Sequence, residues 1–309
     1  MGKIMYCAHP TRIHQDPRLR RKIMGIARKN GFAPVNPFDC GAFEDFEGGS
    51  IGRAKTLEFL IHIMRGCDSV GVFGISDGVM GELKDALERG QDVRVFPGLD
   101  PEWDSQYQKL ERRYGDLFTK LRGPNTLIVL VGPTAVGKTF WMDRLLKHCG
   151  SKLGKVKNTT TRQPRGREDH SNYNFVTKRQ FGDGVRDGAF LEHDQYLGDY
   201  YGSSTADIRS VLEDRSGIFA ITPSGAKALW GRRFEINLCI INMLPISSDI
   251  LRNHFDSRGI DDPKKRTRLL RIARGFRLPK HIDHHTVLIT DDIEADGQAL
   301  WTIIEPLIE

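Results

Sequence analysis

Cysteine is scarce in this chain of 309 residues, and the cysteines that are present follow no paired pattern. There are five of them, widely spaced and without any Cys-x-x-Cys pair. Disulfide scaffolds and structural zinc sites both depend on paired cysteines. The sequence is therefore typical of neither, and it predicts a protein of a reducing compartment, the cytoplasm.

Long apolar runs are missing as well. No segment approaches the roughly 20 apolar residues of a membrane-spanning helix. The short run 4–8 leads straight into His9 and Pro10, so we expect neither a secretory signal nor a membrane anchor. With 39% hydrophobic and 28% charged residues, the composition excludes a disordered chain. At roughly 100–200 residues per domain, the length predicts two domains.

The net charge of +6 is concentrated in one segment. From Arg258 to Lys280 there are nine basic and two acidic residues, a local charge of +7, so the remainder sums to about −1. A general positive field that would attract nucleic acid is therefore not indicated. The segment needs a local explanation, of which a solvated helix face is the simplest.

Apolar strands alternate with helical segments in the first third of the sequence. We expect strands at 3–8, 35–38, 69–74 and 92–96, helices at 17–30, 53–65 and 79–89, and a loop at 43–52. Gly31 ends the first helix, at a position that favours a residue without Cβ. The alternation predicts βαβ units around a parallel sheet, in a flavodoxin- or Rossmann-like arrangement.

A second α/β pattern follows a break in the chain. Residues 97–104 contain two prolines and a glycine, and the apolar spacing of 105–121 predicts one helix. Beyond them, strands are expected at 126–131 and 217–221 and a helix at 140–148. We predict an α/β protein with domains at 1–97 and 125–309, joined by a linker helix within 98–124.

A phosphate-binding loop opens the second domain. Its sequence matches G-x-x-x-x-G-K-[ST] in full, between an expected strand and an expected helix. Glycines let backbone N–H groups surround phosphate oxygens, and the helix N-terminus adds its positive end. We expect Lys138 to reach the β- and γ-phosphates of ATP and Thr139 to ligate Mg²⁺. The ATP-binding residues are Gly132, Pro133, Thr134, Ala135, Val136, Gly137, Lys138 and Thr139.

Four further motifs follow this loop in order. They are Asn158-Thr-Thr-Thr-Arg162-Gln-Pro-Arg165, Tyr173-Asn-Phe175, Phe190-Leu-Glu192 and Tyr200-Tyr201-Gly-Ser203. In these motifs and their spacing, residues 125–309 resemble the guanylate kinase family of P-loop nucleoside monophosphate kinases. The resemblance implies ATP-dependent phosphorylation of a (deoxy)nucleoside monophosphate whose base is a purine or modified purine.

The same resemblance implies roles for the acceptor residues. Glu192 would accept hydrogen bonds from the N1–H and the exocyclic amine of a purine, with Ser203 beside it. Guanidinium groups suit a phosphate dianion because they pair with it through two parallel hydrogen bonds. Surface ion pairing of the arginines and core packing of the first tyrosine are the alternatives. The residues that would hold the 5′-phosphate are Arg162, Arg165, Tyr173 and Tyr201.

The chain departs from the family pattern at the end of the strand expected at 217–221. Guanylate kinases carry Asp-x-Asp there, with one carboxylate for Mg²⁺ and one for guanine, whereas this chain has Ala220 and Thr222. Asn158 replaces a serine that contacts the guanine oxygen, although its amide can still donate to a carbonyl. His254 replaces one lid arginine. These departures suggest an altered acceptor, such as a deoxy- or base-modified purine monophosphate.

The resemblance also explains the basic segment. Guanylate kinases have a mobile lid whose arginines close over the donor phosphates, and Arg258 and Arg268 lie near those positions. Phosphoryl transfer depends on positioned positive charge, so we expect both arginines to act with Lys138 in catalysis. Nucleic-acid binding through this segment is the alternative.

Residues 1–97 carry motifs of their own. Tyr6 lies in the first strand, an apolar strand begins at Asp68, and Gly78-x-x-x-Glu82-x-x-x-Ala86 precedes a Gly-x-x-Val strand. In these features the segment resembles the nucleoside 2-deoxyribosyltransferase and deoxynucleotide N-hydrolase superfamily. The ligand-binding residues that this resemblance implies are Tyr6, His9, Arg12, Asp68, Ser76, Asp77, Gly78 and Glu82.

The resemblance would make Glu82 a nucleophile at C1′ during cleavage or exchange of an N-glycosidic bond. Its expected place in the first helical turn favours the ionised form, and Tyr6 could orient it. Arg12 and the turn 76–78 would hold a sugar or 5′-phosphate. The alternatives are a glutamate that only compensates the helix dipole, an N-cap at Asp77 and a domain that binds without catalysis.

The sequence thus predicts a two-domain enzyme of nucleotide metabolism, with ATP and Mg²⁺ as cofactors and a nucleoside monophosphate as substrate. We expect no membrane association, and homo-oligomerisation is left open. Three alternatives remain: a kinase of a ribose phosphate such as ribose 1,5-bisphosphate, a non-catalytic guanylate-kinase-like interaction module, and a nucleic-acid-binding protein.

Overall fold

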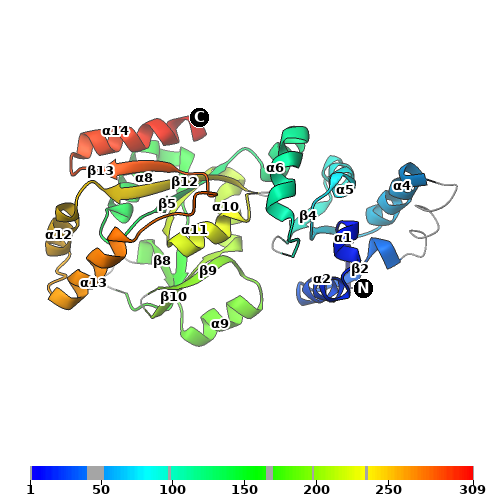
Figure 1. Ribbon diagram of the computed structural model, residues 1–309, viewed down its shortest axis with the longest axis horizontal. Coiled ribbons are helices and arrows are strands. Elements are labelled where there is room, and N and C mark those ends of the chain that lie inside the picture. The colour runs from blue at the N-terminus through cyan, green and yellow to red at the C-terminus, as the bar shows by residue number, and fades with distance from the viewer. Residues whose placement is uncertain are drawn as a thin grey trace. The chain divides into compact units, whose positions relative to one another are not determined.

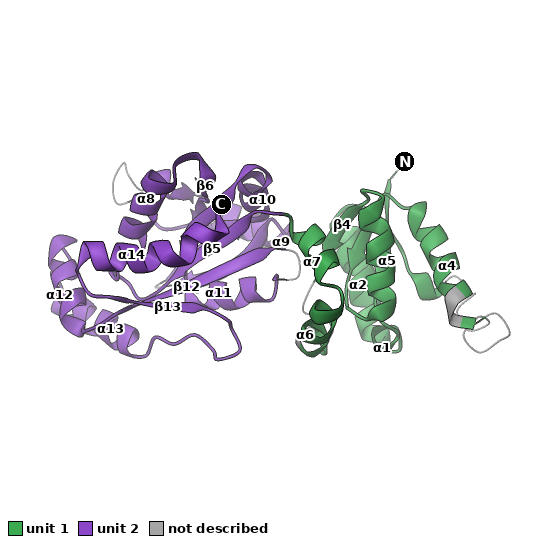
Figure 2. Ribbon diagram, turned by 90° about the horizontal axis from the view of Figure 1, so that it is seen from above, with its two compact units in different colours: residues 1–123 green, residues 124–309 purple. Residues whose placement is uncertain are grey.

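The computed structural model describes residues 2–39, 52–96, 99–164, 170–196, 198–233 and 236–308. The chain forms two compact units, unit 1 (residues 1–123) and unit 2 (residues 124–309), coloured green and purple in Figure 2. Both combine parallel strands with helices, which confirms the α/β fold class. None of the helices in the described ranges is both long and apolar enough to cross a membrane.

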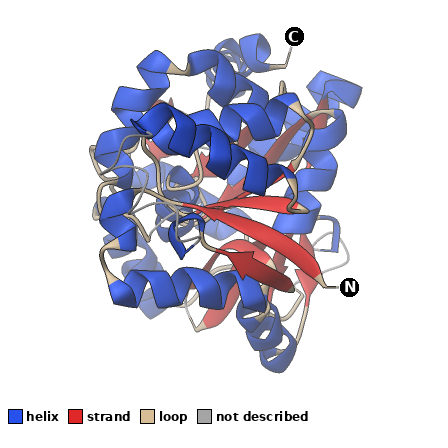
Figure 3. Cartoon of the chain, turned by 90° about the vertical axis from the view of Figure 1, so that its right-hand side faces the viewer, coloured by secondary structure: helices blue, strands red, loops and turns tan. Residues whose placement is uncertain are grey.

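Unit 1 contains a parallel sheet of four strands in the order β2-β1-β3-β4. Its strands are β1 (Lys3–Ala8), β2 (Phe32–Val35), β3 (Ser69–Val72) and β4 (Asp92–Val95). Its first helices are α1 (Thr11–His14), α2 (Pro17–Lys29), η1 (Pro37–Asp39), α4 (Gly52–Arg65) and α5 (Asp77–Glu88). Strand β3 is buried throughout, as expected for a parallel strand covered on both faces. Figure 3 shows helices, in blue, on either side of the strands, in red.

The second strand of unit 1 differs from its prediction. We expected it at 35–38, but β2 ends at Val35 and Pro37 begins a 3-10 turn. Strand β2 pairs only with β1, so it is an edge strand, and an edge tolerates Pro34 because its missing N–H need not join a ladder. Gly31 has a φ of 82° after α2, as predicted. The loop expected at 43–52 lies outside the described residues except for Gly52.

The connector also differs from its prediction. Instead of one helix over 105–121 there are two, α6 (Trp103–Arg113) and α7 (Gly115–Arg122). They are separated at Tyr114, whose φ of −123° and ψ of 33° are not helical, and Gly115, which has low helix propensity, follows. Tyr107 and Phe118 make an edge-to-face contact at 5.4 Å between ring centroids. Both helices fall within unit 1.

Unit 2 contains a parallel five-stranded sheet in the order β13-β12-β5-β11-β6 and a second, four-stranded sheet in the order β8-β7-β10-β9. Its strands are β5 (Thr126–Val131), β6 (Leu153–Lys155), β7 (Asn158–Thr160), β8 (Tyr173–Phe175), β9 (Phe190–Tyr196), β10 (Asp199–Ser204), β11 (Ser216–Ile221), β12 (Asn237–Pro245) and β13 (His285–Ile289). Its helices are α8 (Lys138–Cys149), η2 (Gly150–Lys152), α9 (Lys178–Arg186), α10 (Thr205–Asp214), α11 (Pro223–Trp230), α12 (Ser248–Ser257), α13 (Pro263–Arg274), α14 (Ile293–Ile304) and η4 (Glu305–Leu307).

The central strand β5 explains how the parallel sheet is covered. Its side chains alternate between two hydrophobic clusters, because successive residues of a strand face opposite sides. Leu130 packs in a cluster with residues of α8 and α14, including Trp141 and Leu300. Val129 packs in the other cluster with Leu229 of α11. Figure 1 shows β8, β9 and β10 grouped with α9 on the side of the sheet away from α14.

Candidate active site

The phosphate-binding loop lies between β5 and α8, as the sequence predicts. Gly137 has a φ of 99° and Ala135 a φ of 71°, which turn the backbone into the left-handed region that a cradle of N–H groups requires. A Cβ on Gly132 would lie 2.5 Å from the carbonyl oxygen of Met243. Only glycine therefore fits the start of this loop against β12.

Lys138 is enclosed by its own loop. Its Nζ donates to the carbonyl oxygens of Gly132 at 2.7 Å and Pro133 at 2.9 Å. Desolvation, with a smaller contribution from the charge of Arg258, lowers the pKa of Lys138 to about 7. Among the described residues no carboxylate forms an ion pair with this amine. The loop is therefore suited to an anionic ligand, whose charge would restore the protonated state.

His254 connects this loop to the segment after β13. Its Nδ1 lies 2.6 Å from the carbonyl oxygen of Ala135, and its Nε2 lies 2.9 Å from Oδ1 of Asp291. Both partners are hydrogen-bond acceptors, so the ring links Ala135 to Asp291 through its two nitrogens. Asp291 and Ala135 are the two non-glycine residues with positive φ in the described ranges. His254 thus holds two strained backbone positions together.

The four-stranded sheet aligns four of the predicted acceptor-binding residues in one row. Tyr173 of β8 lies opposite Asn158 of β7, Asn158 opposite Ser203 of β10, and Ser203 opposite Glu192 of β9. Ser203 Oγ donates to Glu192 Oε1 at 2.5 Å and lies 3.2 Å from Asn158 Oδ1. Asn158 Nδ2 donates to the carbonyl oxygen of Ala220 at 2.7 Å. The row is therefore a connected polar network in a buried part of unit 2.

Burial controls the charge of Glu192. Its side chain is buried, and desolvation raises its pKa to about 7, with a further rise from the nearby charge of Asp194 and a partial offset from the Ser203 hydrogen bond. A Cβ on Gly225 would lie 2.6 Å from Glu192 Oε2. The α11 backbone can therefore approach this carboxyl only because residue 225 is glycine.

The predicted phosphate-holding residues form a second cluster. The Arg162 guanidinium lies over the ring of Tyr173, 5.0 Å from its centroid, and Tyr173 and Tyr201 meet edge to face at 6.3 Å. Arg162 also donates to the carbonyl oxygen of Gln163 at 2.8 Å. Three of the four expected groups are thus brought together. The fourth, Arg165, lies outside the described residues.

The two predicted lid arginines lie on separate elements. Arg258 caps the end of α12, and Arg268 lies within α13. Both side chains are exposed. The charge of Arg258 acts on Lys138, which places this arginine within electrostatic range of the phosphate-binding loop. The Thr222 hydroxyl is engaged within the protein. It caps α11 and donates to Asp194 Oδ2 at 2.8 Å.

Sequence reasoning missed Asp194 and Tyr196. They alternate with outward-facing residues of β9 and share a face with Glu192. Tyr196 OH lies 3.0 Å from Thr134 Oγ1 of the phosphate-binding loop. The alternate spacing 192, 194, 196 was the available signal, but no strand was predicted there and the partners are remote in sequence.

In unit 1, Tyr6 and Glu82 form a buried pair. Tyr6 OH donates to Glu82 Oε1 at 2.6 Å. Desolvation raises the pKa of Glu82 to about 7. Two expectations are therefore wrong: Glu82 is the sixth residue of α5 rather than part of its first turn, and its surroundings favour the neutral form. Burial outweighs the helix dipole here.

Other predicted ligand residues of unit 1 are engaged within the protein. Arg12 donates to Asp100 and to the carbonyl oxygen of Ile75, and Asp68 accepts from the backbone N–H of Ile4. Ser76, not Asp77, is the N-cap of α5. These contacts position the start of β1 and the start of α5, where Gly78 lies in the helix rather than in the expected turn.

His9 and Asp77 complete the predicted set in unit 1. His9 is buried against Phe38, and desolvation lowers its pKa to about 4. Asp77 accepts from Arg113 and Tyr114 at 2.8 and 3.0 Å. His9 is therefore neutral at physiological pH, whereas Asp77 ties the start of α5 to the connector helices.

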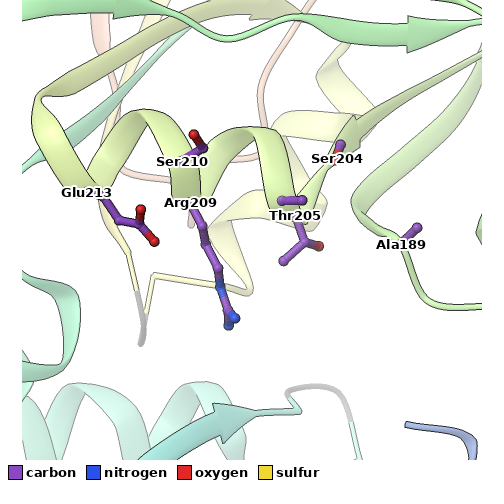
Figure 4. A pocket seen from close by; sticks show the side chains of 7 residues that line it. Ala189, Ser204, Thr205, Arg209, Ser210 and Glu213 are labelled. Carbon is purple, nitrogen blue, oxygen red and sulfur yellow. The ribbon is translucent and has the colours of Figure 1, made fainter.

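An open hollow lies elsewhere on unit 2, along α10 (Figure 4). It has a volume of about 490 Å³, and Arg209 extends into it from the helix. It contains no residue of the phosphate-binding loop or of the Glu192 row. The residues that line it are Ala189, Ser204, Thr205, Ala206, Arg209, Ser210 and Glu213.

Comparisons with known proteins cover unit 2. The family model described as guanylate kinase matches residues 124–307, which leaves the whole of unit 1 outside its range. The guanylate kinase of Ruegeria sp. (strain TM1040) is 32% identical over 191 residues, 60% of this chain and 86% of the relative. That of Alkalilimnicola ehrlichii is 33% identical over 186 residues, 58% of this chain and 89% of the relative.

A solved structure is also similar to this chain. The guanylate kinase from Anaplasma phagocytophilum has a TM-score of 0.45 and 20% identity, and the match covers 60% of this chain and 88% of that chain. Guanylate kinases use ATP and Mg²⁺, as the sequence predicts for this protein. On the family match and the two relatives, and with the loop and acceptor motifs in one unit, the chain belongs to the guanylate kinase family.

Proposed function

We propose that unit 2 catalyses transfer of the γ-phosphate of ATP to a purine (deoxy)nucleoside monophosphate. One observation carries this proposal: a phosphate-binding loop with an enclosed lysine and a buried carboxyl row occur in one unit, linked through β9 by the contact between Tyr196 and Thr134. The first suits a triphosphate, and the second suits the hydrogen-bond donors of a base.

The donor site consists of the loop 132–139. Its backbone N–H groups and Lys138 would surround the phosphates of ATP, and Thr139 would ligate Mg²⁺. Arg258 and Arg268 would add positive charge during transfer. The loop fits such a ligand because the amine of Lys138 donates to two carbonyl oxygens, an arrangement that an anion would stabilise. The chemistry required of these residues is positioning and charge stabilisation.

The acceptor site consists of two parts of the four-stranded sheet. Arg162, Tyr173 and Tyr201, with Arg165, would hold the 5′-phosphate. The base would face Glu192, where Ser203 and Asn158 orient the carboxyl. Thr222 would contribute to this site through its hydrogen bond to Asp194. A base that lacks N–H groups along the facing edge would leave the buried carboxyl unpaired, which is the physical basis for discrimination.

A coupled assay of ADP formation tests this function. The full chain is supplied with ATP, Mg²⁺ and one acceptor at a time: GMP, dGMP, IMP, AMP or ribose 1,5-bisphosphate. We expect turnover with purine monophosphates. The proposal would be overturned if none of these acceptors were phosphorylated, or if ribose 1,5-bisphosphate were the only one. The second result would establish the ribose-phosphate kinase alternative.

We propose a second function for residues 1–97, cleavage or exchange of the N-glycosidic bond of a deoxynucleotide. The observation that favours it is the buried hydrogen bond between Tyr6 and Glu82. A tyrosine that holds one carboxyl oxygen leaves the other to approach C1′ of a sugar, as the nucleophile of a retaining mechanism does. The raised pKa of Glu82 requires that substrate binding favour its ionised form.

Chromatography of free base tests this second function. The full chain is incubated with each of the four deoxynucleoside monophosphates without ATP. We expect base release that disappears in Glu82→Gln and persists in Lys138→Ala. If no base is released, or if release persists in Glu82→Gln, the glycosidic proposal is wrong.

A further inference from the structure

Strand β11 lacks the carboxylates that the guanylate kinase resemblance leads us to expect at its end. Ala220 and Thr222 stand there instead. Yet a carboxylate does reach the same place in space. Thr222 Oγ1 donates to Asp194 Oδ2 at 2.8 Å, and Asp194 belongs to β9, 28 residues earlier in the chain. Strand β9 lies beside α11 in Figure 1.

Asp194 lies on the face of the sheet that carries the acceptor residues. In the β9–β10 register Glu192 is opposite Ser203 and Asp194 is opposite Tyr201, and directly opposite residues share a face. Asp194 therefore follows Glu192 by one strand repeat, toward the phosphate-holding cluster. The charge of Asp194 also contributes to the raised pKa of Glu192, as expected for two neighbouring carboxylates.

The orientation of Asp194 is fixed from two sides. Its Oδ1 accepts from its neighbour's backbone N–H, that of Gln195, at 2.7 Å. The Thr222 hydroxyl that donates to Oδ2 accepts in turn from Gly225 N at 3.0 Å, as the cap of α11. A carboxylate has about four lone-pair sites, so these two bonds leave acceptor capacity for a ligand. The half-buried side chain is thus fixed in orientation and can still accept hydrogen bonds from a ligand.

We propose that Asp194 supplies, from β9, the second carboxylate of the base-binding site, and that Thr222 positions it. This inference rests on the proposed function of unit 2. Two acceptor groups side by side fit a base edge with adjacent donors, the N1–H and the exocyclic 2-amino group of a 2-amino-6-oxopurine. Hypoxanthine lacks the amino group and adenine lacks the N1–H, so each leaves a carboxylate without a partner.

In this proposal the base-binding site keeps two carboxylates, and the second comes from β9 instead of β11. The sequence departures at 220 and 222 suggested an altered acceptor, whereas the position of Asp194 favours retention of the guanine class. In this arrangement Asp194 is a specificity-determining residue, and Thr222 is a positioning residue that acts through it.

The experiment compares GMP with IMP, which differ only in the 2-amino group. For the full chain we expect kcat/KM to favour GMP at least about tenfold, since one unpaired charged group costs at least that factor. Asp194→Ala should lower this GMP-to-IMP ratio about tenfold. Thr222→Ala should lower it less. His193→Ala, on the outward face of the same strand, is the matched control and should leave the ratio unchanged.

Moving the carboxylate to the other strand provides a second test, in which selectivity is expected to be restored. In the double variant Asp194→Ala/Thr222→Asp the carboxylate moves from β9 to the end of β11, and the GMP-to-IMP ratio should recover. Asp194→Asn repeats the test with a side chain of the same size, in case the alanine variant folds poorly. An unchanged ratio in both Asp194 variants, with GMP turnover intact, overturns the inference and leaves the kinase proposal standing.

Binding separates this inference from the proposed function. Calorimetric titration of the wild-type chain and Asp194→Asn with GMP and IMP measures the pocket without turnover. If no nucleotide is phosphorylated but GMP binds more tightly than IMP in an Asp194-dependent way, the kinase proposal fails and the inference stands. If the wild-type chain binds neither nucleotide, both are wrong.

Discussion

In the part of the chain that the structure describes, each unit contains one buried glutamate with a hydroxyl partner, and the two differ in their surroundings. Glu82 in unit 1 accepts from Tyr6 at 2.6 Å and Glu192 in unit 2 accepts from Ser203 at 2.5 Å. Desolvation is the largest cause of a pKa of about 7 in both. Only Glu192 has a second carboxylate nearby that also raises its pKa. A buried carboxyl with a raised pKa therefore does not by itself define a function. The groups around it do.

The neighbours of Glu192 form a network that crosses four strands, whereas Tyr6 is the side chain to which Glu82 is hydrogen-bonded. The register of the four-stranded sheet brings Asn158 and Ser203 beside Glu192, and Asp194 follows Glu192 on the same strand. Strand β9 then continues to Tyr196 and the phosphate-binding loop. The two units therefore differ in that the strand of Glu192 contacts the phosphate-binding loop. Substitutions can test this difference.

The largest effect is expected for Lys138→Ala. Removal of the amine that would neutralise the transferred phosphate should lower kcat/KM for phosphoryl transfer on the order of 10³-fold. Base release by unit 1 should not change. The ADP-formation assay measures the first and chromatography the second. Lys147→Ala, an exposed lysine of the same helix, is the control, and equal losses in both variants would contradict the assignment.

The next effect is a contrast between Glu192→Gln and Glu82→Gln. The first exchanges a charged acceptor of the base for an amide, which should lower kcat/KM for GMP roughly 10- to 100-fold, the worth of a charged hydrogen bond. The second should leave phosphoryl transfer unchanged. If Glu82→Gln slows phosphoryl transfer as much as Glu192→Gln does, the two units are not functionally separate.

The pH dependence of KM follows from the same pair. The pKa of Glu192 is raised to about 7, so its ionised, accepting form increases as pH rises through 7. KM for GMP should therefore fall between pH 6 and 8, and the fall should disappear in Glu192→Gln. Initial rates over this range measure it. A wild-type KM that rises instead would mean that the protonated carboxyl is the form that binds.

Stability should show the opposite pH trend in both units. Each glutamate has a folded-state pKa above its ordinary value of 4.5. The folded state therefore binds more protons between pH 4.5 and 7, and the free energy of unfolding falls as pH rises through this window. Each buried carboxyl accounts for up to about 3 kcal/mol. Urea unfolding at pH 5 and 8 should show a smaller fall in either Glu→Gln variant than in the wild type.

The smallest effect is expected for His254→Asn. The asparagine cannot reproduce both contacts of the ring, so the loop around Ala135 loses support and KM for ATP should rise several-fold. The GMP-to-IMP ratio should stay constant, because the two partners of His254, Ala135 and Asp291, are not members of the Glu192 row. Asn253→Ala, on the exposed side of α12, is the control. A change in acceptor preference would show that His254 acts on the base site.

Local signals predicted much of unit 2. The phosphate-binding loop is a continuous motif whose glycines and lysine have fixed roles, and its position between β5 and α8 is confirmed. The strand 126–131 is confirmed with the same bounds because it is a continuous apolar run that is buried on both faces. By contrast, the predictions of a strand at 35–38 and of one helix over 105–121 were wrong. Strand β2 ends before Pro37, and the connector is interrupted at Tyr114.

The sequence by itself determined which chemical groups the protein carries: the loop lysine, the paired arginine motif and a glutamate on each of two α/β patterns. These follow from residue type and near-neighbour spacing. Only the tertiary structure decided which of the groups act together. Asp194 meets Thr222, and His254 joins Ala135 to Asp291, because strand register and loop packing bring remote residues within hydrogen-bond distance. Charge and burial at each glutamate likewise depend on the folded surroundings, which no local pattern encodes.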